Sequence, residues 1–358
     1  RKEKLVLPFR KKTLPVLGID VSEAAVKLLE LSHRGPNYQV ESYAVEQLAP
    51  NSVAEKTIND VDAVGETIAR VVQKSGTKTK DAAVCVAGSS VITKVINMPA
   101  GLSDDDMESQ IQIEAEQHIP FPLDQVSIDF EVQNQPEEGE EDVSVLLAAA
   151  RSEIVDNCIA ALELGGLNAK IVDIEAFTIE NTIEWISQSF PPGVSTDEIA
   201  VVDIGSRSMT LSVLEDLKVV YSRDESFGGH QLTEEIQRRY GMSFEEAAIA
   251  KKTGSLPEDY NSEVLEPFKE NLISEISRAL QFFYSSSQTA DIDILVVAGG
   301  CASIPHLADL IEPRLEIKTM IANPFSKMNI SPKVNKKALA NDAPALMIAC
   351  GLAMRGGA

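Results

Sequence analysis

Two short stretches decide the fold: LGIDVSE at positions 17–23 and VDIGSRS at positions 202–208. Each is an apolar strand that ends at an aspartate, followed by small residues and then a second strand-like segment. The two aspartates, Asp20 and Asp203, are 183 positions apart (203 − 20). A unit that recurs at this distance predicts two similar domains that face each other.

A phosphate group held between two such hairpins would explain the pattern. A tight hairpin of small residues presents backbone N–H groups to phosphate oxygens without side-chain collisions. An aspartate at the end of each strand would then face a Mg²⁺ ion, usually through water. One such hairpin is more often an ordinary turn. The pair, together with Gly299-Gly300 after the apolar strand at 294–298, favours a nucleotide site.

Strand-like runs alternate with helical stretches along the chain, which is typical of an α/β protein. Strands are expected at 14–19, 26–32, 37–46, 81–87, 90–98, 128–133, 143–149, 171–174, 199–204, 210–214, 217–223 and 294–298. Helices are expected at 103–118, 61–74, 153–164, 175–187, 264–286 and 343–354, with two more that begin at Gly228-Gly229 and at Ser243. Ser103 with Asp106 and Ser243 with Glu246 have the spacing of helix caps. The acidic segment 136–141 reads as a hairpin loop.

The composition argues against several classes of protein. The net charge is −23, from 55 acidic and 32 basic residues, so a nucleic-acid partner is not expected. The four cysteines form no C-x-x-C pair and the four histidines are dispersed, which gives no zinc site and no disulfide framework. The longest apolar run is too short to span a membrane, and residues 1–12 lack the apolar core of a signal peptide. A cytoplasmic location is the expectation.

Residues 1–12 are basic and stand apart from the acidic remainder. They read as a flexible arm or as a short docking segment, with LVLPF at positions 5–9 as its apolar centre. A docking segment could occupy a protein groove, in the same molecule or in a neighbouring one, or contact an anionic membrane surface.

Five segments resemble the superfamily of actin, the heat-shock chaperones and the sugar kinases. They read LGIDVSEAAVKLLEL (first phosphate motif), IVDIEAFTIENTI (first connecting helix), VVDIGSRSMTLSVL (second phosphate motif), ILVVAGGCASIPHL (adenosine motif) and ALMIACGLAMR (second connecting helix). The stretch ESQIQIEAEQHIPFPLDQVSIDFEV is similar to the PilM family, an FtsA-like branch that acts in type IV pilus assembly and twitching motility. The resemblance implies an α/β actin-like ATPase fold, in which two RNase H-like domains surround a nucleotide cleft and one carries an inserted subdomain of the FtsA and PilM type.

The resemblance also implies how the chain is divided. Domain I would span 13–196, with the inserted subdomain at about 82–168, and would be completed by the C-terminal helix 343–356. Domain II would span 197–342 and would contain an outer subdomain at about 226–293. Residues 1–12 would form a basic tail.

By position, the resemblance assigns ATP and Mg²⁺ to one set of residues. Asp20 and Asp203 would face the metal, and Glu175 would position the attacking water, with Asp203 as a second catalytic residue. The other contacts to the nucleotide would come from both hairpins, the helix start, the adenosine motif and a lysine that flanks the adenine: Ser22, Lys27, Gly205, Ser206, Gly228, Gly229, Lys251, Gly299, Gly300, Ala302 and Ser303.

Some positions depart from the family pattern. Glu23 lies in the first hairpin, where its charge would repel a triphosphate unless it points outward. Arg207 replaces a small residue in the second hairpin, and His306 stands where glycine is common in the adenosine loop. Backbone donors survive such changes, whereas an in-line water needs well-placed groups. These departures put hydrolysis in doubt more than binding.

The function implied by the resemblance is an ATP-dependent scaffold at the cytoplasmic face of the inner membrane. It would bind the cytoplasmic N-terminal tail of a PilN-like membrane protein beside the insert, contact motor ATPases of the pilus machine, and could self-associate. Two alternatives stay open. One is an active ATPase or kinase of the superfamily, although no sugar-binding constellation is visible. The other is an FtsA-like division filament protein, whose family carries a C-terminal amphipathic helix that is not expected after position 355.

Overall fold

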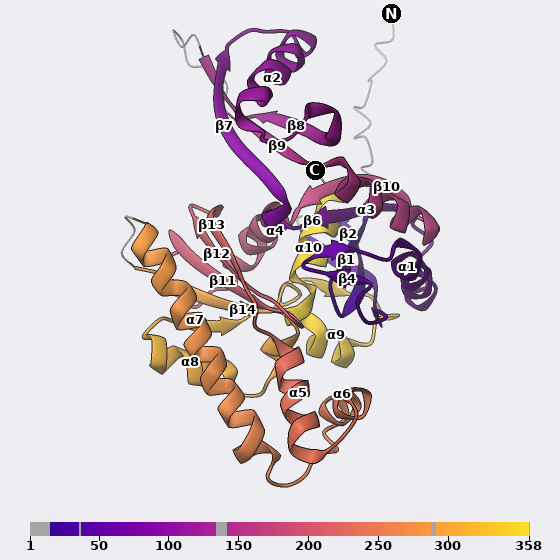
Figure 1. The fold of residues 1–358 in the computed structure, drawn as a ribbon, viewed down its shortest axis with the longest axis vertical. Helices are drawn as coiled ribbons and strands as arrows, with labels where there is room; N and C mark the ends of the chain where they lie inside the picture. The colour runs from indigo at the N-terminus through magenta and orange to yellow at the C-terminus, as the bar shows by residue number, and fades with distance from the viewer. Residues whose placement is uncertain (1–14, 36, 134–141, 288–290, 358) are drawn as a thin grey trace, which may run out of the picture.

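The computed structural model describes residues 15–35, 37–133, 142–287 and 291–357 of the 358-residue chain. Two larger sheets form its centre (Figure 1). The first sheet has the order β10-β6-β1-β2-β3-β16. Its strands are β1 (Leu17–Val21), β2 (Ala25–Arg34), β3 (Asn37–Gln47), β6 (Asp81–Val86), β10 (Asn168–Ile174) and β16 (Asn329–Ile330).

The second sheet repeats the layout of the first. Its order is β13-β12-β11-β14-β15. The strands are β11 (Glu198–Ile204), β12 (Met209–Glu215), β13 (Lys218–Glu225), β14 (Ile294–Ala298) and β15 (Thr319–Ile321). In both sheets the first strand pairs antiparallel with the hairpin strand after it and parallel with a strand that arrives later in the chain. The duplication predicted from the two aspartate motifs is therefore confirmed in the topology.

Helices cover the outer faces of both sheets. The apolar side chains of α1 (Val61–Ser75) and α3 (Ser152–Leu164) share one core with β1 and β6. On the second sheet, α5 (Gly229–Tyr240), α6 (Phe244–Thr253), α7 (Glu266–Ser286) and α8 (Leu307–Leu315) enclose a core with β11 and β12. Both predicted caps are present: the Ser103 hydroxyl accepts from Asp106 N–H before α2 (Asp104–His118), and Ser243 and Glu246 form a capping box before α6.

Two helices lie between the sheets (Figure 1). The first, α4 (Glu175–Ser187), packs its isoleucines on the second sheet, and α10 (Met347–Met354) packs mainly on the first sheet. The two helices cross at Gly351, where an added Cβ would lie 2.0 Å from the carbonyl oxygen of Thr178. Gly18 allows a similar approach, since its Cβ would lie 2.1 Å from the oxygen of Ala349 in α10. Glycine at these points lets the helices fill the space between the two halves.

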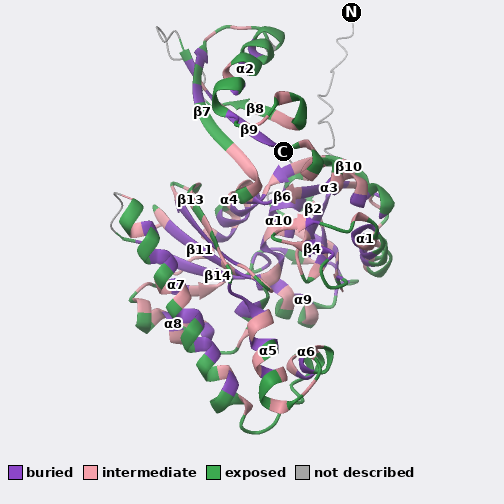
Figure 2. Cartoon of the chain, in the orientation of Figure 1, coloured by how far each residue is buried: buried purple, intermediate pink, exposed green. Residues whose placement is uncertain are grey.

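A third sheet stands apart from the other two and carries α2 on one face (Figures 1 and 2). It has the order β7-β9-β8, with β7 (Val91–Pro99), β8 (Val126–Val132) and β9 (Asp142–Arg151). We call residues 91–151 the inserted sheet. The expected range of 82–168 was too wide, because β6 is hydrogen-bonded between β1 and β10 and α3 packs on α1 in the first core.

Several short elements were not predicted. They include the hairpin of β4 (Val53–Ala54) and β5 (Thr57–Ile58), α8, α9 (Lys336–Asp342), β15 and β16. The predicted helix at 264–286 begins in a π-helical turn at 261–265, and the last predicted helix begins in a 3₁₀ turn at 343–346. The basic tail 1–12 and the acidic segment 136–141 lie outside the described residues. Within the described ranges, no helix is both long and apolar enough to cross a membrane.

Candidate functional site: a charged cluster between two hairpins

The first hairpin places Asp20 beside Lys27. They are directly paired in the β1–β2 register, and the Lys27 ammonium lies 2.7 Å from an Asp20 carboxylate oxygen. Asp20 is only 4% exposed. Ser22 closes the turn, since its N–H and its hydroxyl both donate to the carbonyl of Ala25. One oxygen of Glu23 is buried and has no hydrogen-bond partner among the described residues.

The second hairpin is packed against the start of α5. Gly229 N–H donates to the carbonyl of Gly205, and His230 N–H donates to that of Ser206. An added Cβ on Gly228 would lie 2.4 Å from the Ser206 oxygen. Glycine at 228 is therefore required for this approach, and the predicted residues Gly205, Ser206, Gly228 and Gly229 pack directly together, with Gly228 and Gly229 buried.

The predicted adenosine loop packs against the second hairpin at Gly299. Gly299 has φ of 87°, and its Cβ would lie 2.6 Å from an Asp203 carboxylate oxygen, so the left-handed turn brings the loop onto the second aspartate. Ala302 is buried. By contrast, Gly300 faces open space, and Ser303 is exposed, with its hydroxyl donating to the Gly300 carbonyl.

Lys251 reaches the same region from α6. Its ammonium donates to the Gly229 carbonyl at 2.8 Å and to the Thr233 hydroxyl at 2.6 Å. Burial lowers the pKa of Lys251, an effect that the nearby Cys301 opposes. The lysine is thus engaged by the first turn of α5, directly behind the glycines that contact the second hairpin.

Buried acids and one lysine from the two halves of the chain interact electrostatically where the hairpins approach each other. Burial lowers the pKa of Lys27, but the charges of Asp20, Asp203 and Glu175 together raise it above its usual value. Burial raises the pKa of Asp203, and the charge of Lys27 offsets this only partly. The structure therefore brings together the predicted residues Asp20, Lys27, Asp203 and Glu175 from both halves of the chain.

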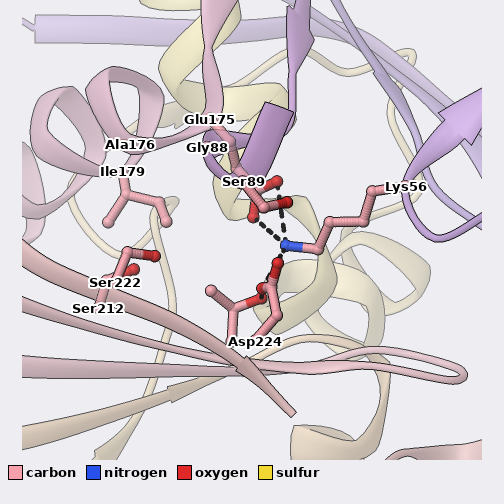
Figure 3. A pocket seen from close by; sticks show the side chains of 10 residues that line it. Lys56, Gly88, Ser89, Glu175, Ala176, Ile179, Ser212, Ser222 and Asp224 are labelled. Atoms are coloured by element: carbon pink, nitrogen blue, oxygen red, sulfur yellow. Dashed lines mark hydrogen bonds and ion pairs between the residues drawn. The ribbon is translucent and has the colours of Figure 1, made fainter. Parts of the chain in front are cut away.

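No motif pointed to Lys56, which lies at the centre of the charge cluster (Figure 3). Its ammonium contacts both oxygens of Glu175, at 3.0 and 3.2 Å. It also donates to the Thr210 hydroxyl at 2.8 Å and to Asp224 at 2.9 Å. Burial raises the pKa of Glu175, although the charge of Lys56 opposes that effect.

Asp224 was also missed. Burial raises its pKa, but the charge of Lys56 and hydrogen bonds from Lys56, Thr210 and Ser89 bring it below the usual value. These groups line a small pocket between α4, β12, β13 and the turn before β7 (Figure 3). Neither residue belongs to a recognisable motif. Lys56 is 119 positions from Glu175 and 168 from Asp224, so sequence spacing could not reveal the contacts.

The acids suit a cation that arrives with a phosphate. Among the described residues, no group of three or more histidine, cysteine or acidic side chains could hold a metal ion by itself. Mg²⁺ is commonly held by one or two carboxylates together with phosphate oxygens and waters. Asp203, whose pKa is raised by burial, is a carboxylate that a divalent cation would stabilise. The pair of Asp20 and Asp203 therefore fits Mg²⁺ bound with a nucleotide better than Mg²⁺ alone.

Comparisons with known proteins agree with this fold. The family model described as type IV pilus assembly protein PilM matches residues 18–357. The solved structure of a PilM–PilN type IV pilus biogenesis complex has a chain that is 26% identical, with a TM-score of 0.76; the match covers 96% of this chain and 99% of that one. The ethanolamine utilization protein EutJ from Carboxydothermus hydrogenoformans is 15% identical, with a TM-score of 0.55 and coverage of 95% and 89%.

The EutJ similarity supports the fold alone, whereas the family match extends from the first phosphate hairpin to the end of the last connecting helix. The family match includes the inserted sheet. The sequence of that segment had indicated the PilM family within the wider superfamily. The predicted actin-like ATPase fold is confirmed, and the chain belongs to the PilM family of type IV pilus assembly proteins.

Proposed function

We propose that this PilM-family protein binds ATP with Mg²⁺ in the cleft between its two hairpins. The supporting observation is the convergence of Asp20 with Lys27 from the first hairpin and Asp203 from the second. Backbone N–H groups of both turns would contact phosphate oxygens, and the loop from Gly299 to Ser303 would border the adenosine. Bound Mg²⁺ would neutralise phosphate charge.

The side chains around the phosphates would have distinct tasks. Lys27 fixes the position of the Asp20 carboxylate, since the two are paired at 2.7 Å. Glu175 begins α4 and is the buried acid best placed to orient a water molecule. Its two oxygens are occupied by Lys56, so its capacity as a base is restrained. Slow or partner-dependent hydrolysis follows, rather than rapid turnover.

We further propose that the chain binds the N-terminal tail of a PilN-like membrane protein and acts as an assembly scaffold at the cytoplasmic face of the inner membrane. Support comes from the similarity to the chain of the PilM–PilN complex, which extends over 96% of this chain. A ligand that binds one conformation of the protein more tightly shifts the equilibrium toward that conformation. The affinity of a partner that prefers one conformation would then change as well.

A peptide titration tests the partner proposal. A fluorescent peptide with the first residues of a PilN-type protein from the same genome is titrated with the purified chain, without nucleotide and with Mg-ATP. Saturable binding, with a Kd that changes several-fold upon addition of Mg-ATP, is expected. A scrambled peptide of the same composition is the control. Equal binding of both peptides would reject the specific interaction.

A further inference from the structure

Lys56 is held in an unusual backbone conformation. It occupies the tip of the hairpin between β4 and β5, where Glu55 has φ of 50° and Lys56 has φ of 58°. Two consecutive left-handed residues form a turn that favours asparagine and glycine, and glutamate and lysine are strained there. A conformation of this kind persists where the surrounding contacts hold it in place.

The contacts that hold Lys56 come from both halves of the molecule. Glu175 follows β10 of the first sheet, whereas Thr210 and Asp224 belong to β12 and β13 of the second. Figure 3 shows the Lys56 side chain extending between Glu175 and Asp224. The side chains of Lys56 and Glu175 are 19% and 11% exposed, so this pair is shielded from water and weighs more than a surface ion pair, whereas the Asp224 side chain is 32% exposed. One ammonium group therefore links the two sheets across the cleft.

Asp224 extends this link to the inserted sheet. Besides Lys56, it accepts a hydrogen bond from the Thr210 hydroxyl, and Ser89 lines the same small pocket. Ser89 lies in the 3₁₀ turn Gly88–Ser90, which leads directly into β7. Glu175, Lys56 and Asp224 are thus joined by ion pairs, and the pocket that they line is closed on one side by Ser89 at the base of the inserted sheet.

We propose that Lys56 is a latch that couples the nucleotide cleft to the base of the inserted sheet. While the ammonium is bound by Glu175 and Asp224, the β4–β5 hairpin and the turn before β7 are both fixed to the second sheet. A change of charge at Glu175 acts on the same ammonium, and so reaches Ser89 through Asp224. The contacts of Lys56 in the nucleotide-free protein do not depend on the proposed function. Only the response of the latch to nucleotide rests on the proposed function.

Hydrogen exchange without nucleotide tests the latch directly. Lys56→Gln removes the ammonium and keeps a polar side chain of similar length. Amide exchange is expected to become about tenfold faster or more at both 53–58 and 88–92. These two segments are not adjacent in the chain, so a change in both reports a contact between them. Asp224→Asn should accelerate the same two segments. Lys78→Gln removes an equal charge from an exposed position between α1 and β6 and should leave both segments unchanged.

The double variant separates coupling from general loosening. If Lys56 and Asp224 act through one link, Lys56→Gln with Asp224→Asn should accelerate exchange at 88–92 no more than the stronger single variant does. Multiplying effects would overturn the latch, as would unchanged exchange at 88–92 in Lys56→Gln. Variants that lose protection throughout the core would also count against it, because the residue would then be a general stability element.

A second arm uses Mg-ATP. In the wild type, nucleotide is expected to change exchange at 88–92 at least threefold, and Lys56→Gln should abolish that change. A response that persists in Lys56→Gln overturns the coupling. If calorimetry detects no nucleotide binding to the wild type, the proposed nucleotide function fails, and the nucleotide-free exchange still decides whether the latch exists.

Discussion

At the scale of single residues, two buried carboxylates of the site lower the stability of the nucleotide-free protein. Asp203 and Glu175 are carboxylates whose pKa values are raised because burial penalises their charged forms. The native state then binds more protons than the unfolded state between the unfolded and native pKa values. The free energy of unfolding contributed by each group therefore falls as the pH rises through that window. Such acids are retained where a cation is to be bound.

Asp203→Asn should stabilise the nucleotide-free protein and weaken its binding of Mg-ATP. Removing the buried charge at unchanged shape is expected to raise the free energy of unfolding at pH 7 by on the order of 1 kcal/mol. The gain should disappear near pH 3, below the unfolded pKa of about 3.9, where the carboxylate is protonated in the unfolded state as well. Urea unfolding of the variant and the wild type at the two pH values measures the gain in stability and its loss at low pH. Asp156→Asn, at an exposed position of α3, is the control and should change neither.

Some residues of the site could be predicted from the sequence. Asp20 was predicted from the strand that ends at it, and Lys27 was predicted from the family resemblance; the two are directly paired in the hairpin register. Asp203 repeats the position of Asp20 in the second sheet. Lys56 and Asp224 could not be predicted, because their contacts depend on how two sheets are placed and not on any spacing within one segment.

At the scale of elements, local signals predicted the long helices and strands well. Periodicity and caps located α1, α2 and α4 to within a residue or two, and the cap at Ser243 located the start of α6. The two-residue strands of β4 and β5 were missed, since an alternating pattern cannot be read in so short a run. The ends of the inserted sheet were misplaced because β6 and α3 continue the same alternation of strand and helix on the other side of the boundary.

The cap of α6 gives a direct test at this scale. Ser243→Ala removes the hydroxyl that accepts the Glu246 N–H and is expected to lower the free energy of unfolding by about 1 kcal/mol. Ser243→Asp keeps an acceptor at the same position and should retain most of the stability. Chemical denaturation of the two variants beside the wild type measures the difference. Equal losses in both would show that the cap contributes nothing.

The crossing of α4 and α10 gives a second test. In an exposed helix, glycine to alanine is stabilising by roughly 1 kcal/mol. At Gly351 the new Cβ would lie 2.0 Å from the Thr178 carbonyl oxygen, so the helices must separate. Gly351→Ala should instead destabilise by roughly 1–3 kcal/mol. Gly88→Ala, where nothing lies within 4 Å of the added Cβ, is the control for thermal unfolding. A stabilised Gly351→Ala would contradict the observed packing.

At the scale of the whole molecule, two sheets of matching topology are joined by a pair of crossed helices. Trp185, the one tryptophan in the sequence, packs against both the core on the first sheet and the core beneath the second. The hairpins, the first turn of α4 and the loop at Gly299 meet where the two sheets face each other. Binding there would hold both halves at once, which is the physical basis for a nucleotide-dependent scaffold.

Calorimetric titration of Mg-ATP into the wild type, Asp20→Ala and Asp203→Ala tests this account most directly. The wild type should bind one nucleotide per chain, and each variant should bind at least tenfold more weakly while remaining folded by circular dichroism. Chelation of magnesium should weaken wild-type binding in the same direction. A wild-type protein that takes up neither ATP nor ADP in the presence of magnesium, or variants that bind as tightly as the wild type, would contradict the assignment of the cleft.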